Sequence, residues 1–540
     1  MIERRKTFPT LPLGGTSLVL LFALFLLPGL AGHDPWKVED ANHFGVVWRL
    51  VQGDGWLNLN LAGEPWPEAP LYYWLAALTA KALAWILPVH DGARVATSLC
   101  AAFAFFALSR AGREFHGRDH QTAAPLLLAG SLGLLVHVHE TQPAIAYLAA
   151  QAAGLWGLAL MQRRPLYGTL IFGSATGLAV LTTGLGGLPS LVLPSLALPF
   201  VVSEYRGRTA LANGAGLLLG AFLAALWPLA LALYAPGQLE FWWSNESNQL
   251  QAFPAIKEAT LQMLSIAPWY AWPALPVAAW TLWMQRRQLT TPALLLPLLA
   301  TIGAALSIVT TTDARSIAGL PLLPPLALLA AAGLPHLRRG AANGFDWFGM
   351  ITFTLAGGLV WLGWGAMTWG HPEQIARNFA KLSPGYEAAI SPLALGLATA
   401  TTLAWFWLIF SSPRSPYRAA THWLAGMTLV WALVSTLWLP WIDHGKTYRP
   451  VVDGLARALP PHGGCIAGRG LTPAMRTALD YFADIRTTPL ASEEGQRCRW
   501  LITLGSARTE TMPEGSWKQI WEGHRASDRS ERLRLFHRTK

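Results

Sequence analysis

Charged side chains are scarce in this chain of 540 residues, because Asp, Glu, Lys and Arg together make up only 13% of it. A typical soluble protein carries about 25%. Apolar residues make up 53% and recur in long stretches along the whole sequence. So little polar surface is typical of proteins that live in a lipid bilayer, and the useful unit of organisation is therefore the membrane span.

Several other features are missing. The sequence has no P-loop and no dinucleotide fingerprint, which argues against an ATP-driven pump. Its three cysteines exclude a dense disulfide framework. The net charge of +10 does not indicate a nucleic-acid partner, because Lys and Arg lie in small groups between apolar stretches, as they do in membrane proteins.

About thirteen apolar stretches approach the length of a transmembrane helix, which is about 20 residues. They lie near residues 16–32, 94–112, 123–138, 142–161, 166–182, 188–203, 210–234, 264–284, 290–310, 316–335, 345–366, 390–410 and 420–440. The first stretch has a basic start but is not followed by a small-residue cleavage site, so we interpret it as a retained anchor and not as a signal peptide.

Basic residues mark one side of the predicted bundle. They gather at the N-terminus and in short odd-numbered connections such as Arg163-Arg164 and Arg338-Arg339, and they are sparse in the longer connections between. Because cytoplasmic loops are enriched in Lys and Arg, this pattern predicts a cytoplasmic N-terminus and a C-terminus outside, in the periplasm of a bacterial inner membrane. Residues 71–88 are then expected to form a helix in the membrane interface and not a further span.

The chain changes character after the last predicted span. Residues 1–440 form the expected membrane domain, whereas no apolar run in residues 441–540 approaches membrane length. Short apolar runs and helical stretches there predict a small C-terminal α/β domain outside the membrane. Cys465 and Cys498 lie in it, and in an oxidising compartment they either pair or remain free; their spacing does not decide which.

Acidic side chains are enriched in the first long segment outside the membrane, residues 33–93. A solvated loop is one explanation of this enrichment. The alternative is catalysis, because a carboxylate held beside apolar groups at an interface can act as a general base. The adjacent residues Glu39 and Asp40 are the leading pair for that role.

Four parts of the sequence resemble a known family. The first outer segment holds an acidic pair before Ala41, then Gly55-Trp56, then Glu68 and Pro70 before two aromatic residues. It is similar to the first outer loop of bacterial glycosyltransferases of family 39/83, which include the lipid A aminoarabinose transferase and the protein O-mannosyltransferases. The stretches that carry the resemblance are Trp36–Gly45, Leu61–Tyr73, Gly177–Gly184, Pro268–Pro276 and Leu320–Ala327, the last of them preceded by Ala314-Arg315.

The resemblance implies an all-α GT-C fold of about thirteen transmembrane helices, with juxtamembrane helices in the first outer loop. It also implies transfer of a sugar from a polyprenyl-phosphate donor to a lipid, glycan or protein acceptor. Glu39 falls at the family's catalytic Asp and Asp40 at the Glu after it, so both are expected to be catalytic. The residues expected to bind substrate are Glu68, Tyr72, Arg315, Trp242 and Trp243.

This chain also departs from the family pattern. Ala69 and Thr183 stand where the family commonly has lysines, which removes two positive charges that would serve the donor phosphate. Glu68 falls at a position associated with a metal, but residues 241–251 contain no histidine to complete a site, so a divalent metal is poorly supported. A lipid or solute transporter or flippase, and a non-catalytic paralogue in glycan assembly, therefore stay open as alternatives.

Overall fold

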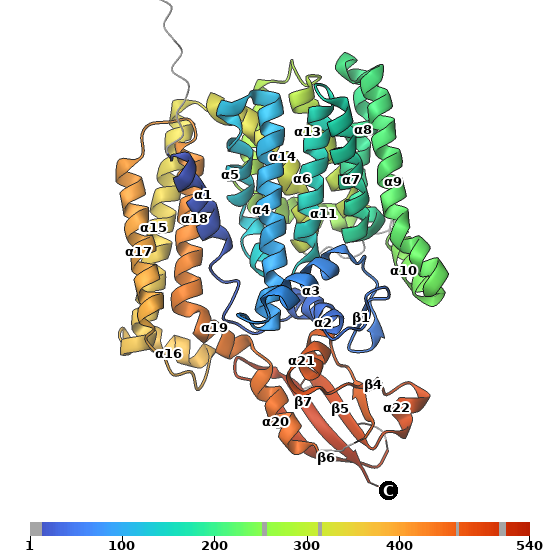
Figure 1. Ribbon diagram of the computed structural model, residues 1–540. Helices are drawn as coiled ribbons and strands as arrows, with labels where there is room; N and C mark the ends of the chain where they lie inside the picture. The colour runs from blue at the N-terminus through green and yellow to red at the C-terminus, as the bar shows by residue number, and fades with distance from the viewer. Residues whose placement is uncertain are drawn as a thin grey trace, which may run out of the picture.

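The computed structural model describes residues 13–250, 256–310, 316–460, 464–506, 513 and 515–539. Within these ranges the chain forms a bundle of helices with a small mixed sheet at one end (Figure 1). The predicted class, a polytopic α-helical membrane protein with a small C-terminal α/β unit, is confirmed.

Eight helical segments in the described ranges are long and apolar enough to cross a membrane. They are Val89–His116 (α4), Pro143–Met161 (α6), Pro165–Gly187 (α7, Pro165–Thr183, and a 3-10 turn), Arg208–Tyr234 (α9), Ile317–His336 (around α14, Leu323–Gly333), Arg339–Trp369 (α15), Pro392–Ser411 (α17) and Arg418–Ala458 (α18, Arg418–Leu433, to α20). A bent pair, Arg118–Ala129 and Leu132–His139, passes the same test together. Shorter apolar helices are Gly15–Leu26 (α1), Pro189–Val201 (α8), Ala274–Met284 (α12) and Pro292–Ile308 (within α13).

These helices coincide with the apolar stretches predicted from the sequence. The number of crossings stays a prediction, because the bent pair and the four short helices do not each meet the length of a full span. Helix α5 (Ala123–Ala129) forms part of the bent pair, and α11 (Ile256–Tyr270) precedes α12 within the predicted stretch 264–284.

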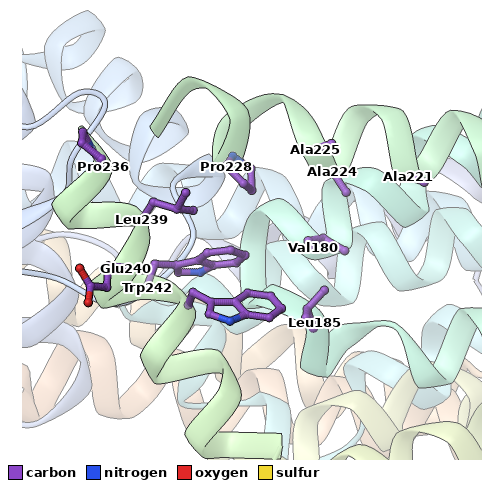
Figure 2. A pocket seen from close by; sticks show the side chains of 11 residues that line it. Val180, Leu185, Ala221, Ala224, Ala225, Pro228, Pro236, Leu239, Glu240 and Trp242 are labelled. Carbon is purple, nitrogen blue, oxygen red and sulfur yellow. The ribbon is translucent and has the colours of Figure 1, made fainter. Parts of the chain in front are cut away.

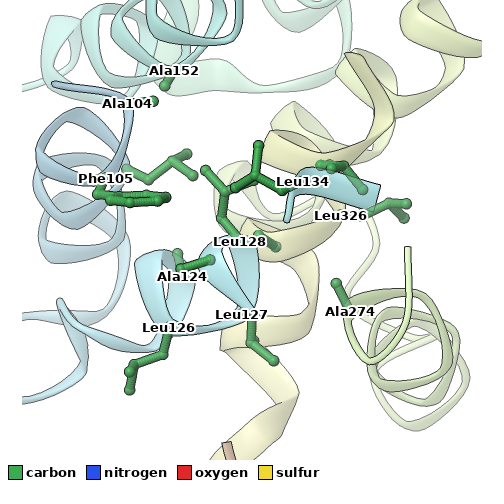
Figure 3. Packing of buried hydrophobic residues seen from close by; sticks show 14 of the residues in the cluster. Ala104, Phe105, Ala124, Leu126, Leu127, Leu128, Leu134, Ala152, Ala274 and Leu326 are labelled. Carbon is green, nitrogen blue, oxygen red and sulfur yellow. The ribbon is translucent and has the colours of Figure 1, made fainter. Parts of the chain in front are cut away.

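The centre of the bundle is packed through small residues. On α6, Gly157 faces α7 so closely that a Cβ atom there would lie 2.5 Å from the backbone nitrogen of Phe172. Such contacts let helix backbones approach and gain dispersion energy where lipid gives no hydrophobic drive. Figure 3 shows the apolar side chains of this core, with Phe105 of α4, Leu128 of α5 and Leu326 of α14 converging from separate helices.

The elements outside the bundle gather at its sheet-bearing end (Figure 1). From the first outer segment come α2 (Glu39–Val51), β1 (Asn60–Leu61), β2 (Glu64–Pro65) and α3 (Leu71–Leu83), and from later segments α10 (Pro236–Leu250) and α16 (Glu373–Leu382). The sequence predicts that these segments and the C-terminus share one side, and in the structure they do. Which compartment that side faces stays a prediction.

The C-terminal unit is a five-stranded sheet with strand order β4-β3-β5-β7-β6. Strands β3, β4 and β5 are parallel, and β7 pairs antiparallel with β5 and β6. Cys465 and Cys498 form a disulfide in this unit. The elements are α19 (Leu439–Lys446), α20 (Arg449–Ala458), β3 (Ile466–Arg469), α21 (Pro473–Ala483), β4 (Thr488–Pro489), α22 (Glu493–Arg497), β5 (Trp500–Ser506), β6 (Trp517–Arg525) and β7 (Asp528–Arg538).

Helix α21 docks this unit onto α2. Ala41 belongs to the same buried cluster as Ala474 and Ala478 of α21. Gly45 allows the close approach, since a Cβ atom there would collide with Thr477. The predicted boundary after residue 440 falls within α19, and the division into two domains stays a prediction.

Candidate active site at the sheet-bearing end of the bundle

Helix α2 presents two acidic residues in its first turn, where negative charge is favoured by the helix dipole. Residues four apart share a helix face, so Glu39 and His43 lie together. Asp40 points to a different side of the helix and is 1% exposed, whereas 18% of the Glu39 side chain is exposed. The two carboxylates therefore belong to different environments.

Asp40 is held in a buried network. Arg94 of α4, wholly buried, donates to both of its oxygens, at 3.2 Å from Nε and 2.6 Å from Nη2. The backbone nitrogens of Trp36 and Thr141 donate to the same carboxylate, at 3.2 and 2.8 Å. Burial alone would raise the pKa of Asp40, but the Arg94 charge and these hydrogen bonds hold it well below its usual range.

The same cluster reaches the C-terminal segment. Arg94 also pairs with Asp91, at 2.8 Å. Asp34 accepts hydrogen bonds from Arg449, at 2.9 Å from Nε, and from Thr447, at 2.7 Å. The contacts of Asp40 therefore hold α2 against α4, which is a structural role. They do not favour the catalytic role predicted for Asp40.

Glu39 faces a second cluster. Its Oε2 atom lies 3.2 Å from Nε2 of His43, and Nδ1 of His43 lies 2.8 Å from the hydroxyl of Tyr73. Tyr73 donates to Glu68 at 2.5 Å and accepts from the indole of Trp66 at 2.8 Å. Two predicted site residues, Glu39 and Glu68, are thus joined through His43 and Tyr73, which the sequence analysis did not single out.

Tyr72 lies apart from this cluster. Its side chain is fully buried, and its hydroxyl lies 2.7 Å from Thr97 and accepts from the backbone nitrogen of Gln142 at 2.8 Å. Of the two adjacent tyrosines, Tyr72 therefore packs in the interior and Tyr73 belongs to the site. The structure does not favour substrate contact by Tyr72.

Glu246 on α10 is a buried acid that the sequence analysis missed. Its side chain accepts from the backbone nitrogen of Leu185 at 2.9 Å, and a Cβ atom at Gly184, where φ is +69°, would collide with it. Burial raises the pKa of Glu246, and the charge of Glu68 acts in the same direction. Its only sequence signal is that it is the one acid in the polar run Ser244–Gln249.

An apolar groove includes Leu185, whose backbone nitrogen bonds Glu246. It has a volume of about 580 Å³ and is lined by residues of α7, α9 and α10 and by Leu185. Figure 2 shows the Trp242 ring reaching toward Leu185 and Val180, while the carboxylate of Glu240 points away from them. Trp243, also in the lining, is 55% exposed.

Ala69 connects the groove to the acidic cluster. It follows Glu68 in the chain and packs in a buried cluster with Trp227 and Trp242. The position where the resembling family has a lysine is therefore filled by apolar packing. Thr183, at the second such position, bonds back to the carbonyl of Ala179 at 3.3 Å.

Two further predictions concern the phosphate and a metal. Arg315 lies outside the described residues. Within the described ranges, no three His, Cys, Asp or Glu side chains are arranged to hold a metal ion. The residues around Glu68 thus do not fit a divalent cation, and no step is assigned to one.

Comparison of the sequence with protein-family models and with characterised proteins finds no match. Among solved structures the chain is similar to ArnT from Cupriavidus metallidurans bound to undecaprenyl phosphate, with a TM-score of 0.67 and 14% identity over 97% of this chain and 98% of that one. For ArnT in the apo state the TM-score is 0.65, at 14% identity over 96% and 98% of the two chains.

A weaker likeness, with a TM-score of 0.47 and 11% identity over 90% of this chain and 69% of that one, is to the archaeal oligosaccharyltransferase AglB from Archaeoglobus fulgidus, in complex with an inhibitory peptide and a dolichol-phosphate. It carries no argument here. The likeness to ArnT spans nearly the whole of both chains, and it shows that this chain has the GT-C fold of ArnT.

Proposed function

We propose that this protein is a membrane glycosyltransferase that moves a sugar from a polyprenyl-phosphate donor to an acceptor at the outer face of a bacterial inner membrane. One observation carries the proposal: in a GT-C bundle, the cluster of Glu39 and Glu68 is linked to an apolar groove through Ala69, which follows Glu68 and packs with Trp242 of the groove wall. A lipid-linked donor needs both a polar reaction centre and an apolar surface for its tail.

The chemistry requires few protein groups. An acceptor oxygen attacks the anomeric carbon, and the bond from that carbon to the donor phosphate breaks. Glu39 accepts the proton of an acceptor hydroxyl, a role in which a positioned carboxylate contributes about 10²–10⁴-fold in rate. Asp40 is assigned to holding α2 through Arg94, because its oxygens already accept four hydrogen bonds.

The groove suits the donor's tail. Its lining of Val180, Pro228, Leu239 and two tryptophans gives an apolar surface, and one of these tryptophans, Trp242, packs with Ala69. The ArnT structure that this chain resembles is bound to undecaprenyl phosphate. Trp242, at 4% exposed, is part of the groove wall, and Trp243 is the better placed of the two to contact donor or acceptor.

The donor phosphate still needs positive charge. With Ala69 and Thr183 at the two positions where the resembling family has lysines, Arg315 is the residue we assign to it, because a guanidinium bonds phosphate through paired hydrogen bonds. A hexose or pentose as the sugar, and a lipid, glycan or protein as the acceptor, complete the proposal.

The test is transfer in proteoliposomes. Purified full-length protein is reconstituted with undecaprenyl phosphate carrying a hexose or a pentose, and with lipids, glycans or proteins from a bacterial envelope. Mass spectrometry follows the acceptor and the released undecaprenyl phosphate. We expect both products with wild type and a loss of at least about 10²-fold with Glu39→Gln. Absence of both products with every donor, together with movement of lipid or solute across the bilayer, would show a transporter instead.

A further inference from the structure

The phenol of Tyr73 determines where one proton of the site lies. A phenol has one hydrogen to donate and two lone pairs that accept. The hydrogen goes to Oε2 of Glu68, and one lone pair accepts from the indole of Trp66. Nδ1 of His43 lies 2.8 Å from the same phenol oxygen. Because the phenol hydrogen is already donated to a carboxylate, Nδ1 must be the donor in this contact and must carry a hydrogen.

Tyr73 keeps its hydrogen in this environment. Its side chain is fully buried, and burial together with the charge of Glu68 raises the pKa of Tyr73. The phenol of Tyr73 therefore keeps its hydrogen, and with it these hydrogen bonds, throughout the physiological pH range.

The second ring nitrogen of His43 then requires a hydrogen between itself and Glu39. Nε2 lies 3.2 Å from Oε2 of Glu39, within hydrogen-bond distance. In a neutral ring protonated on Nδ1, Nε2 offers a lone pair, and a carboxylate oxygen also offers only lone pairs. Two lone pairs at this distance repel, so one hydrogen lies between the two atoms. Only 6% of the His43 side chain is exposed, which leaves water little room to separate them.

We propose that His43 is the positioning residue of the site: through Nε2 it holds Oε2 of Glu39, while Tyr73 and Glu68 hold the other side of its ring. The inference rests on the proposed function, because His43 acts through Glu39 and does not touch the substrate. The acceptor proton then passes to the carboxylate of Glu39 that His43 holds in place.

In the transfer step, the acceptor hydroxyl oxygen forms a bond to the anomeric carbon. The bond from that carbon to the phosphate oxygen breaks, and its electron pair leaves on polyprenyl phosphate. The hydroxyl proton passes to the carboxylate of Glu39, and the hydrogen between Nε2 and Oε2 stays in place. Misplacing a catalytic group by about 1 Å costs on the order of 10²-fold in rate, so loss of this contact lowers kcat.

Two substitutions test the contributions of the two ring nitrogens of His43 one at a time. The amide nitrogen of glutamine reaches the position of Nε2, and that of asparagine the position of Nδ1. The transfer assay uses the same donor and acceptor for every variant. We expect His43→Gln to keep kcat within about fivefold of the wild-type value and His43→Asn to lower it about 10²-fold, with the KM for the donor unchanged in both. If His43 only filled space, the kcat values of the two variants would not differ in this way.

His422 provides a matched control. It is wholly buried and bonds a carboxylate, Asp346, at 2.7 Å, but it lies near the start of α18 (Arg418–Leu433), a helix that does not belong to the proposed site. The folded His422→Asn variant should keep the wild-type kcat. Equal kcat values for the His43 variants would overturn the positioning role, and a retained loss in Glu39→Gln would leave the proposed function standing.

A measurement on the protein alone gives an answer even without turnover. Nitrogen NMR of histidine-labelled full-length protein in nanodiscs, with the His43→Gln spectrum subtracted to assign the signal, reports which ring nitrogens carry hydrogen. We expect a protonated Nδ1 and an Nε2 that shares a hydrogen with Glu39, and this second feature should change in Glu39→Gln. A bare Nδ1, or no response to Glu39→Gln, overturns the proposal.

Discussion

The two faces of helix α2 carry adjacent carboxylates with different tasks. Asp40 lies 1% exposed against a buried arginine, Arg94. Glu39, one residue earlier, is 18% exposed and lies against the imidazole of His43. One face therefore holds a charge that ties α2 to the rest of the fold, and the other holds a charge in the cluster of His43, Tyr73 and Glu68.

Hydrogen bonds explain the structural role of Asp40. Each oxygen of Asp40 accepts one hydrogen bond from the Arg94 side chain and another from a backbone nitrogen. Such a carboxylate is stabilised as an anion and is a weak base. The comparison predicts that substitutions on the Asp40 face change stability, whereas substitutions on the Glu39 face change rate.

The largest effect is expected from Arg94→Met. The substitution leaves Asp40 and Asp91 without their shared cation, and breaking a buried ion pair in this way costs about 3–5 kcal/mol. We expect the free energy of unfolding, measured by SDS titration of the detergent-solubilised protein, to fall by about that amount.

A double variant serves as the control for this loss. Arg94→Met combined with Asp40→Asn removes one of the unpaired charges, so it should be more stable than Arg94→Met alone. An Arg94→Met protein as stable as wild type would contradict the structural role of this face.

His33 adds a pH dependence to the same face. Burial lowers the pKa of His33 from 6.5 to about 4, and the charge of Arg94 acts in the same direction. The folded protein therefore keeps His33 neutral, while the unfolded chain binds a proton below pH 6.5. Stability should fall as the pH falls from about 6.5 to about 4, by up to about 3 kcal/mol from this group.

The measurement is SDS titration at several pH values in wild type and His33→Gln. The variant should lose less stability than wild type between pH 6.5 and 4.5. Parallel curves for the two proteins would show that His33 is not held neutral by its surroundings.

A smaller effect is expected on the Glu39 face from Glu68→Gln. Glutamine keeps an oxygen that accepts from Tyr73, but it removes the charge that orients the phenol and, through it, His43. We expect kcat for transfer to fall about tenfold, which is about 1.4 kcal/mol in the barrier, with the stability unchanged. A Glu68→Gln protein that unfolds more easily at full activity would assign Glu68 to the fold.

The smallest effect is expected from Arg476→Ala. Arg476 pairs with Glu64, whose side chain is 43% exposed, so the pair is screened by water. Exposed ion pairs contribute about 0–1 kcal/mol, and we expect a loss in that range in the same SDS titration. A loss as large as that of Arg94→Met would break the contrast between buried and exposed arginine pairs.

The sequence predicted the bundle well because its signals are local. Apolar length located the helices, and the alternation of basic loops indicated that the first outer segment and the C-terminus share a side, as they do in Figure 1. Glu39 and Glu68 followed from the resemblance and meet in one cluster. His43 could have been found too, because it lies four residues after Glu39 on the same helix.

Long-range contacts account for what the sequence did not predict. The partner of Asp40 lies 54 residues away on α4, and nothing in the local pattern distinguishes Asp40 from Glu39. Glu246 reaches Leu185 across 61 residues. The burial of Tyr72 likewise depends on Thr97, which comes from another helix. The sequence left the state of Cys465 and Cys498 open, and the structure pairs them.

The most direct test compares Glu39→Gln with Asp40→Asn in two assays, sugar transfer and SDS unfolding. Glu39→Gln should lose at least about 10²-fold in kcat and change the free energy of unfolding by less than about 1 kcal/mol. Asp40→Asn should lose about 3 kcal/mol of stability, because Arg94 then lacks its main partner. The opposite pattern, a stable and inactive Asp40→Asn with a fully active Glu39→Gln, would contradict the account.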